Sequence, residues 1–201
     1  MQRSSIKYAL TLIALGCAGE CLAAGTAEIA HAGKTPRTVV SMVNYTVPDV
    51  RMVTESGKNV SLRQELDDGR PVMVNFIFTT CASTCPLSSE TFSIFQDQLA
   101  GQRSSVHLVS ISIDPEQDTP ERLREYAKSF SAGPSWQHYT GTLEASQTAQ
   151  RAFGVYRGDK MGHTPVTLLR AAPGKVWRRI DGFVTPEDLM REYKAALKNQ
   201  E

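Results

Sequence analysis

Two cysteines separated by three residues are the part of this sequence best suited to chemistry. Cys81 and Cys85 lie in the segment FTTCASTCP (residues 78–86), directly after an apolar run at residues 72–78. Because Pro86 suits the first position of a helix, the pair is expected between a strand and the start of the next helix. Unpaired N–H groups at a helix start stabilise a thiolate and lower its pKa. This spacing allows the two sulfurs to meet as a disulfide, a redox couple or part of a metal site.

The first 24 residues are interpreted as a signal peptide. Arg3 and Lys7 precede an apolar stretch at residues 8–18, and the small residues at 23–24 would allow cleavage. An apolar stretch this short does not span a bilayer comfortably, so a retained membrane anchor is the weaker interpretation. The sequence therefore predicts an exported, periplasmic protein.

Charge and cysteine content narrow the function classes. The chain of 201 residues carries 22 basic and 21 acidic side chains, and loss of residues 1–24 leaves equal numbers of each. A neutral protein without a basic run is not expected to bind nucleic acid, which depends on phosphate neutralisation. Cleavage also removes Cys17 and Cys21, so that Cys81 and Cys85 become the only cysteines. A structural disulfide is the simplest alternative for an exported pair, but it would close a short loop and restrict the unfolded chain little.

Strands and helices alternate along the rest of the chain. A linker or extended arm is expected at residues 25–44, and a single domain at residues 45–201. The expected elements of the domain are a small hairpin at 50–62, strands at 72–78 and 106–113, helices at 86–100, 118–130 and 144–153, a hairpin at 166–180 and a final helix from 185. Alternation predicts a parallel sheet, to which the late hairpin adds antiparallel strands. The expected fold class is thus α/β, with a central mixed sheet flanked by helices.

The order of these elements is similar to that of thioredoxin, with the cysteine motif between a strand and a helix and Thr164–Pro165 entering the hairpin. In that fold the residue before this hairpin strand faces the cysteine motif, and a cis-proline is usual there. The thioredoxin-like fold therefore implies that His163 is the third donor and that Thr164–Pro165 is a candidate cis bond. Two thiolates and an imidazole suit copper, or less readily zinc.

The remaining titratable candidates are given structural roles. His31 falls in the linker, His107 in a strand and His138 in a loop. Asp114 is expected to end a strand before a proline, and Asp118 to cap the next helix. None of these residues is assigned to the site.

Several segments together resemble the SCO/SenC family. In chain order, across residues 45–185, they are residues 72–87, the string SISIDPEQDTP (residues 110–120), YTGT (residues 139–142) and the histidine before the hairpin. The resemblance implies a copper-binding thioredoxin fold that acts in assembly of the binuclear copper centre of cytochrome c oxidase. It implies that Cys81, Cys85 and His163 hold Cu(I) or Cu(II). The implied partners are a copper-containing subunit of a respiratory oxidase, or another copper protein, together with thiol-disulfide partners.

The chain departs from that family's pattern around the site. Ala82 and Ser83 stand where a proline and an acidic residue are common, and Gly162 stands where aspartate is frequent. With fewer carboxylates nearby, a cation is attracted more weakly. The departures bear on which copper protein docks more than on the metal itself.

Two functions from different classes fit these residues. In the first, a metallochaperone captures copper with Cys81, Cys85 and His163 and passes it on by ligand exchange. In the alternative, a thiol-disulfide oxidoreductase, one thiolate attacks a partner disulfide and the other cysteine resolves the mixed disulfide. Redox chemistry needs no imidazole at position 163, so the histidine favours the metallochaperone, and enzymatic activity is left open. A thiol peroxidase is disfavoured because Phe78, and not a threonine, stands three residues before Cys81.

Overall fold

The computed structural model describes residues 38–198. The expected signal peptide, His31 and residues 25–37 of the expected linker lie outside the described residues. The described strands are β1 (Val39–Val43), β2 (Arg51–Thr54), β3 (Asn59–Ser61), β4 (Val72–Ile77), β5 (His107–Ser112), β6 (Trp136–Gly141), β7 (Val166–Arg170) and β8 (Trp177–Asp181). The described helices are α1 (Leu62–Leu66), α2 (Thr84–Gln98), α3 (Pro120–Ser129), α4 (Leu143–Ala152) and α5 (Pro186–Lys198), with the 3₁₀ turns η1 (Ala100–Ser105) and η2 (Lys160–Gly162). None of these described helices is long and apolar enough to cross a bilayer.

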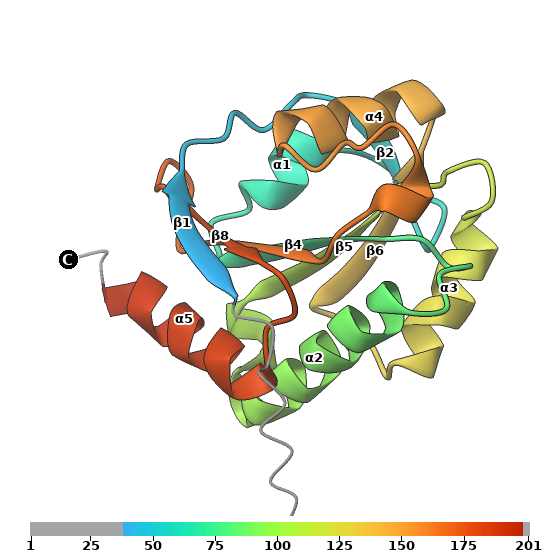
Figure 1. Cartoon of the computed structure of the whole chain (residues 1–201). Helices are drawn as coiled ribbons and strands as arrows, with labels where there is room; N and C mark the ends of the chain where they lie inside the picture. The colour runs from blue at the N-terminus through green and yellow to red at the C-terminus, as the bar shows by residue number, and fades with distance from the viewer. Residues whose placement is uncertain (1–37, 199–201) are drawn as a thin grey trace, which may run out of the picture. The chain divides into compact units, whose positions relative to one another are not determined.

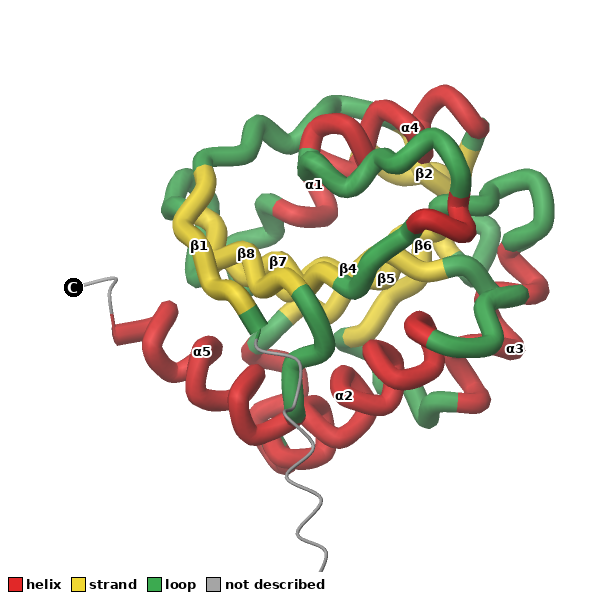
Figure 2. Tube along the Cα trace, viewed as in Figure 1, coloured by secondary structure: helices red, strands yellow, loops and turns green. Residues whose placement is uncertain are grey.

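Within residues 38–198 the strands form one eight-stranded sheet, in the order β1-β8-β7-β4-β5-β6-β2-β3 (Figure 1). β4, β5 and β6 run parallel, and every other described pairing is antiparallel. Figure 2 shows α1 and α4 over one face of the sheet and α2 and α5 over the other. The expected α/β class, a mixed sheet flanked by helices, is therefore confirmed.

The central strand β4 is buried along its whole length because helices cover both faces of the sheet. Val72, Val74 and Phe76 belong to one buried hydrophobic cluster, whereas Met73 belongs to a second cluster that includes residues of α2 and α5. Since side chains of a strand alternate between faces, the two clusters are the cores on the two faces of the sheet. The apolar run in the sequence is thus a strand covered on both sides, as parallel strands usually are.

Three parts of the fold differ from the sequence-based expectation. Residues 39–43, expected in a linker or extended arm, form β1 and pair with β8 in antiparallel register. β1 lies at the edge of the sheet and stays largely exposed, so its sequence carries no clear burial pattern. Residues 136–141 form β6, which places His138 in a buried strand and not in a loop. The short helix α1 has no counterpart among the expected elements.

The peptide bond between Thr164 and Pro165 is trans, and no described peptide bond is cis. The expectation of a cis bond at this position is therefore wrong. The trans form is the lower in free energy for a bond before proline, by about 0.5–1 kcal/mol, and the local chain accommodates it here.

Candidate functional site

The cysteines lie where the central strand β4 is followed by α2, as the sequence predicts. β4 ends at Ile77, and α2 begins at Thr84 with Ser83 as its N-cap. Cys81 is partly exposed in the intervening loop, whereas Cys85, in the first turn of α2, is 2% exposed. The backbone N–H of Cys85 donates to Cys81 Sγ over 3.4 Å, which holds the two residues together. Both thiols are free.

The two thiols have opposite pKa shifts. Burial acts to raise the pKa of Cys81, but it is outweighed by hydrogen bonds from the Thr84 hydroxyl and from backbone N–H groups at the start of α2, which lower this pKa to about 6. Burial raises the pKa of Cys85 to about 12, and the neighbouring Cys81 sulfur adds to this effect. At neutral pH the pair is therefore one thiolate, at the more exposed position, and one buried thiol. The expected stabilisation of a thiolate by the helix start acts on Cys81.

A buried carboxylate fixes the loop that leads to Cys81. Asp118 is fully buried, and its Oδ1 accepts hydrogen bonds from the Thr79 backbone N–H at 3.0 Å and from the Thr79 hydroxyl at 2.6 Å. Its Oδ2 accepts a hydrogen bond from the Ser112 hydroxyl at 2.6 Å. The expectation that Asp118 caps the next helix is therefore wrong. The N-cap of α3 is Thr119, and the Asp118 carboxylate is directed to the end of β4 instead.

His163 follows η2 and contacts the central strand. Its Nε2 lies 3.0 Å from the carbonyl oxygen of Phe76. Because a carbonyl oxygen only accepts, Nε2 carries the proton and Nδ1 keeps its lone pair. Burial lowers the pKa of His163, so the imidazole is neutral at neutral pH. Nδ1 is therefore the ring atom free to bind a metal ion.

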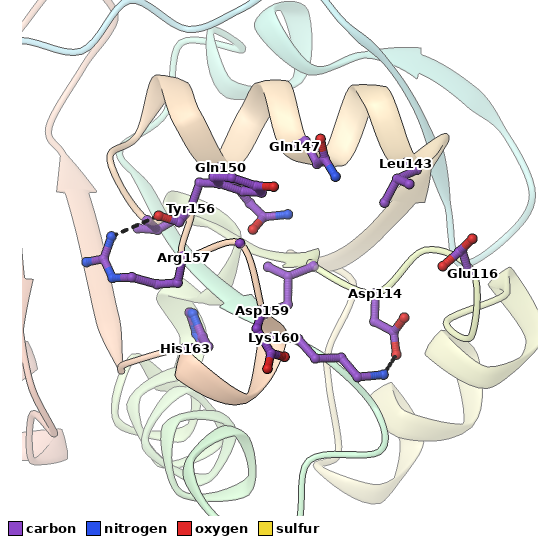
Figure 3. A pocket seen from close by; sticks show the side chains of 13 residues that line it. Asp114, Glu116, Leu143, Gln147, Gln150, Tyr156, Arg157, Asp159, Lys160 and His163 are labelled. Atoms are coloured by element: carbon purple, nitrogen blue, oxygen red, sulfur yellow. Dashed lines mark hydrogen bonds and ion pairs between the residues drawn. The ribbon is translucent and has the colours of Figure 1, made fainter.

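The structure brings the two cysteines together but does not complete a three-ligand site. Within residues 38–198, no three His, Cys, Asp or Glu side chains lie close enough together to hold a metal ion. His163 instead lines a cavity of about 300 Å³, bordered by α4 and η2 (Figure 3). Gln147 and Gln150 of α4, with Arg157 and Lys160, contribute polar groups to its wall. A site that used all three expected ligands would require the imidazole to move toward the cysteines.

The loop between β5 and α3 makes two contacts near the site that the sequence pattern does not predict. Asp118 holds Thr79, and the carboxylate of Asp114 forms an ion pair with Lys160, whose Nζ lies 2.5 Å from Asp114 Oδ2. Thr79 and Asp118 are 39 residues apart in the chain, and Asp114 and Lys160 are 46 residues apart. No local sequence pattern therefore indicates these contacts. The acidic string at residues 110–120 is the only signal that points to this loop.

Comparisons with a family model and with known proteins agree with each other. The family model described as SCO1/SenC matches residues 43–198. The SCO1 protein homolog of Bacillus subtilis is 29% identical over 164 residues, which cover 77% of this chain and 84% of that protein. The residues matched by the family model include β4, the cysteine loop, the β5–α3 loop and His163.

Solved structures of the same fold include two Sco proteins. BsSco, described as a member of the Sco family of cytochrome c oxidase assembly proteins with a disulfide switch, has a TM-score of 0.64 and 27% identity, covering 79% of this chain and 96% of that one. ScoI of Bradyrhizobium japonicum, solved with copper bound, has a TM-score of 0.61 and 25% identity, covering 73% of this chain and 96% of that one. The likeness confirms the thioredoxin-like arrangement expected from the order of the elements.

Proposed function

Since the chain belongs to the SCO1/SenC family, we propose that it is a metallochaperone that binds copper through Cys81, Cys85 and His163. Copper is its cargo, held as Cu(I) or Cu(II) and delivered to the copper centre of a respiratory oxidase. The receiving partner is a copper-containing oxidase subunit or another copper protein. The site of action is the periplasm, to which the predicted signal peptide at residues 1–24 would direct the chain.

The observation that supports this proposal most directly is that both ligand loops contact the backbone near the end of β4, at Phe76 within the strand and at Phe78 just after it. The backbone N–H of Cys81 donates to the Phe78 carbonyl at 3.1 Å, and His163 Nε2 donates to the Phe76 carbonyl at 3.0 Å. Positions two residues apart along a strand are separated by about 7 Å. Movement of the loop that follows η2 toward Phe78 would therefore bring the imidazole closer to the cysteine pair.

The protonation states of the three side chains suit copper. Cys81 is already a thiolate at neutral pH, and His163 is neutral with Nδ1 free. Cys85, whose pKa is raised to about 12, must lose its proton when it binds the ion. Thiolate and imidazole ligands together suit copper in either oxidation state, with the thiolates favouring Cu(I).

Exposed apolar side chains beside both ligand loops support delivery to another protein. Leu87, two residues beyond Cys85, is 57% exposed, and Met161, two residues before His163, is 74% exposed. We propose that these two side chains form part of an apolar contact surface that a partner covers. A partner that docks here would place its own ligands next to the exposed Cys81 sulfur, where ligand exchange can begin.

The second candidate function is thiol-disulfide exchange, and the asymmetry of the cysteine pair favours it. The exposed Cys81 thiolate would attack one sulfur of a partner disulfide and release the other as a thiolate. Cys85 would then lose its proton and attack the Cys81 sulfur, which releases the second partner thiolate and leaves a Cys81–Cys85 disulfide. The partner gains two electrons and this chain loses two. Such a step would reduce the cysteines of a copper target before it is loaded.

Complementation distinguishes the two functions. Cells that lack the native gene would receive the wild-type chain, His163→Ala or the double variant Cys81→Ser with Cys85→Ser, and the copper content of the oxidase would be measured by its optical spectrum. If copper delivery is the function, His163→Ala should fail as the double cysteine variant fails. Full restoration by His163→Ala, with failure of the double cysteine variant, would instead establish thiol exchange as the function.

A further inference from the structure

The loop between β5 and α3 is attached to both loops that carry the candidate ligands. At one end, Asp118 accepts two hydrogen bonds from Thr79, two residues before Cys81. At the other end, Asp114 pairs with Lys160, three residues before His163. No other described carboxylate pair connects the cysteine loop with the histidine loop in this way. We call residues 114–119 the β5–α3 bridge.

The two carboxylates are held at a fixed spacing by the backbone of the bridge. The N–H groups of Gln117 and Asp118 both donate to the Asp114 carbonyl, at 3.0 Å and 2.9 Å. The Ser112 hydroxyl donates to Asp118 Oδ2, and its oxygen accepts from the Asp114 backbone N–H at 3.0 Å. Hydrogen bonds within the bridge therefore constrain the spacing of the two carboxylates.

The two ends of the bridge differ in how tightly they hold. Asp118 is fully buried and accepts three hydrogen bonds, and a buried carboxylate cannot give these up without a large cost. The Asp114–Lys160 pair is more accessible, because 36% of the Lys160 side chain is exposed although only 9% of the Asp114 side chain is. An ion pair that is open to solvent on one side is weakened and is partly screened by salt. The Asp118 contacts with the cysteine loop are thus the fixed end of the bridge. The Asp114–Lys160 ion pair with the histidine loop is the contact that can break.

We propose that the β5–α3 bridge sets the position of His163 relative to the cysteines, with Asp118 fixing the cysteine loop and the Asp114–Lys160 pair retaining the histidine loop apart from it. The inference rests on the proposed function, because it concerns the same three ligands. Among the described residues these three do not form a ligating group. Assembly of the site requires the histidine loop to shift toward the cysteine loop, and the Lys160 contact opposes that shift. Lys160 and Asp118 are accordingly positioning residues of the site.

The histidine end is tested with Lys160→Met, with Lys160→Arg as the variant that keeps the charge and Lys175→Met as a control at an exposed lysine of the β7–β8 turn. Cu(II) affinity depends on the imidazole more than Cu(I) affinity does. Loss of this partly exposed ion pair should tighten Cu(II) binding by about two- to fivefold, with little change for Cu(I). Lys160→Arg and Lys175→Met should match the wild type, and high salt should reduce the gain. Unchanged or weaker Cu(II) binding by Lys160→Met would overturn the proposal.

The cysteine end is tested with Thr79→Val, which removes one hydrogen bond to Asp118, against Thr80→Val at the neighbouring exposed position. Amide hydrogen exchange across residues 79–81 should become about tenfold faster in Thr79→Val, as expected for loss of a hydrogen bond to a carboxylate. Thr80→Val should exchange at the wild-type rate. Equal exchange in the two variants would show that Asp118 does not fix this loop.

The ring ¹⁵N resonances of His163 provide a readout that does not depend on copper. In Lys160→Met without added metal, the Nε2 hydrogen bond to Phe76 should weaken, and both ring resonances should shift. If the wild-type chain binds no copper, the proposed function fails, whereas the bridge is still judged by these resonances. If copper binds normally and the His163 resonances of Lys160→Met match the wild type, the β5–α3 bridge does not position His163. The proposed function would be unaffected by that result.

Discussion

At the scale of single residues, the site depends on how differently two neighbouring thiols ionise. Cys81 is the more exposed, and hydrogen bonds that outweigh its burial lower its pKa to about 6. Cys85 is buried beside it, and burial raises its pKa to about 12. Both proposed reactions therefore begin at Cys81, as the first copper ligand or as the attacking thiolate. Cys85 follows once it has lost its proton.

Replacing Thr84 with valine should raise the pKa of Cys81, because the Thr84 hydroxyl lies 3.4 Å from Cys81 Sγ and stabilises the thiolate. A hydrogen bond to a charged group contributes about 1.5–3 kcal/mol, and partial exposure places the effect at the lower end, so we expect a rise of about one pKa unit. The measurement is the rate of alkylation of the reduced protein against pH. In the wild type this rate should fall as pH drops through about 6, where the thiolate is protonated.

Thr84→Ser is the matched control, because it keeps the hydroxyl and removes only a methyl group. Its alkylation profile should follow that of the wild type. A Thr84→Val profile that coincides with both would mean that the backbone N–H groups at the start of α2 alone account for the acidity of Cys81.

At the scale of elements, local patterns predicted where the cysteines lie but not what holds them. The apolar run at residues 72–78 and Pro86 at a helix start are short-range signals, and they located the loop between β4 and α2. The roles of Asp118 and Lys160 depend on partners that are distant in the sequence. The hydrophobic periodicity of the chain does not predict such contacts. His138 shows the same limit. Its ring stacks on the Trp136 ring within β6, and burial lowers its pKa to about 3. The polar residues of this segment do not indicate a buried strand.

The position of His163 could be predicted only in part. Its place before β7 followed from the thioredoxin-like order of elements, which the structure confirms. The sequence does not show that the imidazole donates to Phe76 and lines a cavity apart from the cysteines. These features depend on the path of η2, and η2 makes a tertiary contact, the Asp114–Lys160 pair, that no local sequence pattern indicates.

Acidic residues placed at Ser83 and Gly162, next to the candidate ligands, should strengthen Cu(II) binding. Ser83 is the N-cap of α2 without a side-chain hydrogen bond, and the first turn of α2 contains no acidic residue. A Cβ added at Gly162 would meet Arg157 Cβ at 3.7 Å, an ordinary contact. We expect Ser83→Asp with Gly162→Asp to raise Cu(II) affinity through space, while Cu(I), held chiefly by thiolates, changes less. The two affinities would be compared by competition titration.

Ser83→Asn with Gly162→Asn is the neutral control of nearly the same shape. The gain of the acidic variant over this control should shrink at higher ionic strength, because the added charges are partly exposed. A gain in copper affinity that is equal for Cu(I) and Cu(II) and does not change with salt concentration would indicate a geometric cause. It would exclude the electrostatic cause.

At the scale of the whole molecule, the described domain is held together by a core on each face of its sheet and not by its cysteines. Both thiols are free, and the two buried clusters contain the largest apolar side chains, among them Trp177, Phe92 and Phe153. The loop that a Cys81–Cys85 disulfide would close is short. The fold should therefore persist in either redox state, which leaves the pair available for metal or exchange chemistry.

Reduction of a Cys81–Cys85 disulfide should lower the melting temperature only modestly. For a loop of this length the entropic contribution of the cross-link is about 2 kcal/mol, which corresponds to a shift of roughly 4–8 °C for a domain of this size. The measurement is thermal unfolding of the oxidised and the fully reduced protein, followed by circular dichroism. Unfolding at ambient temperature on reduction would show that the disulfide is structural.

The central claim, a copper site made of two thiolates and an imidazole, is tested most directly by copper titration of the reduced protein with absorption and paramagnetic resonance spectra. The wild type should bind one copper per chain, with thiolate charge-transfer bands and nitrogen coupling in the Cu(II) form. Cys81→Ser, Cys85→Ser and His163→Ala should each impair binding, and His163→Ala should remove the imidazole nitrogen coupling. Unchanged stoichiometry, affinity and spectra in His163→Ala would contradict the account by removing this histidine from the site.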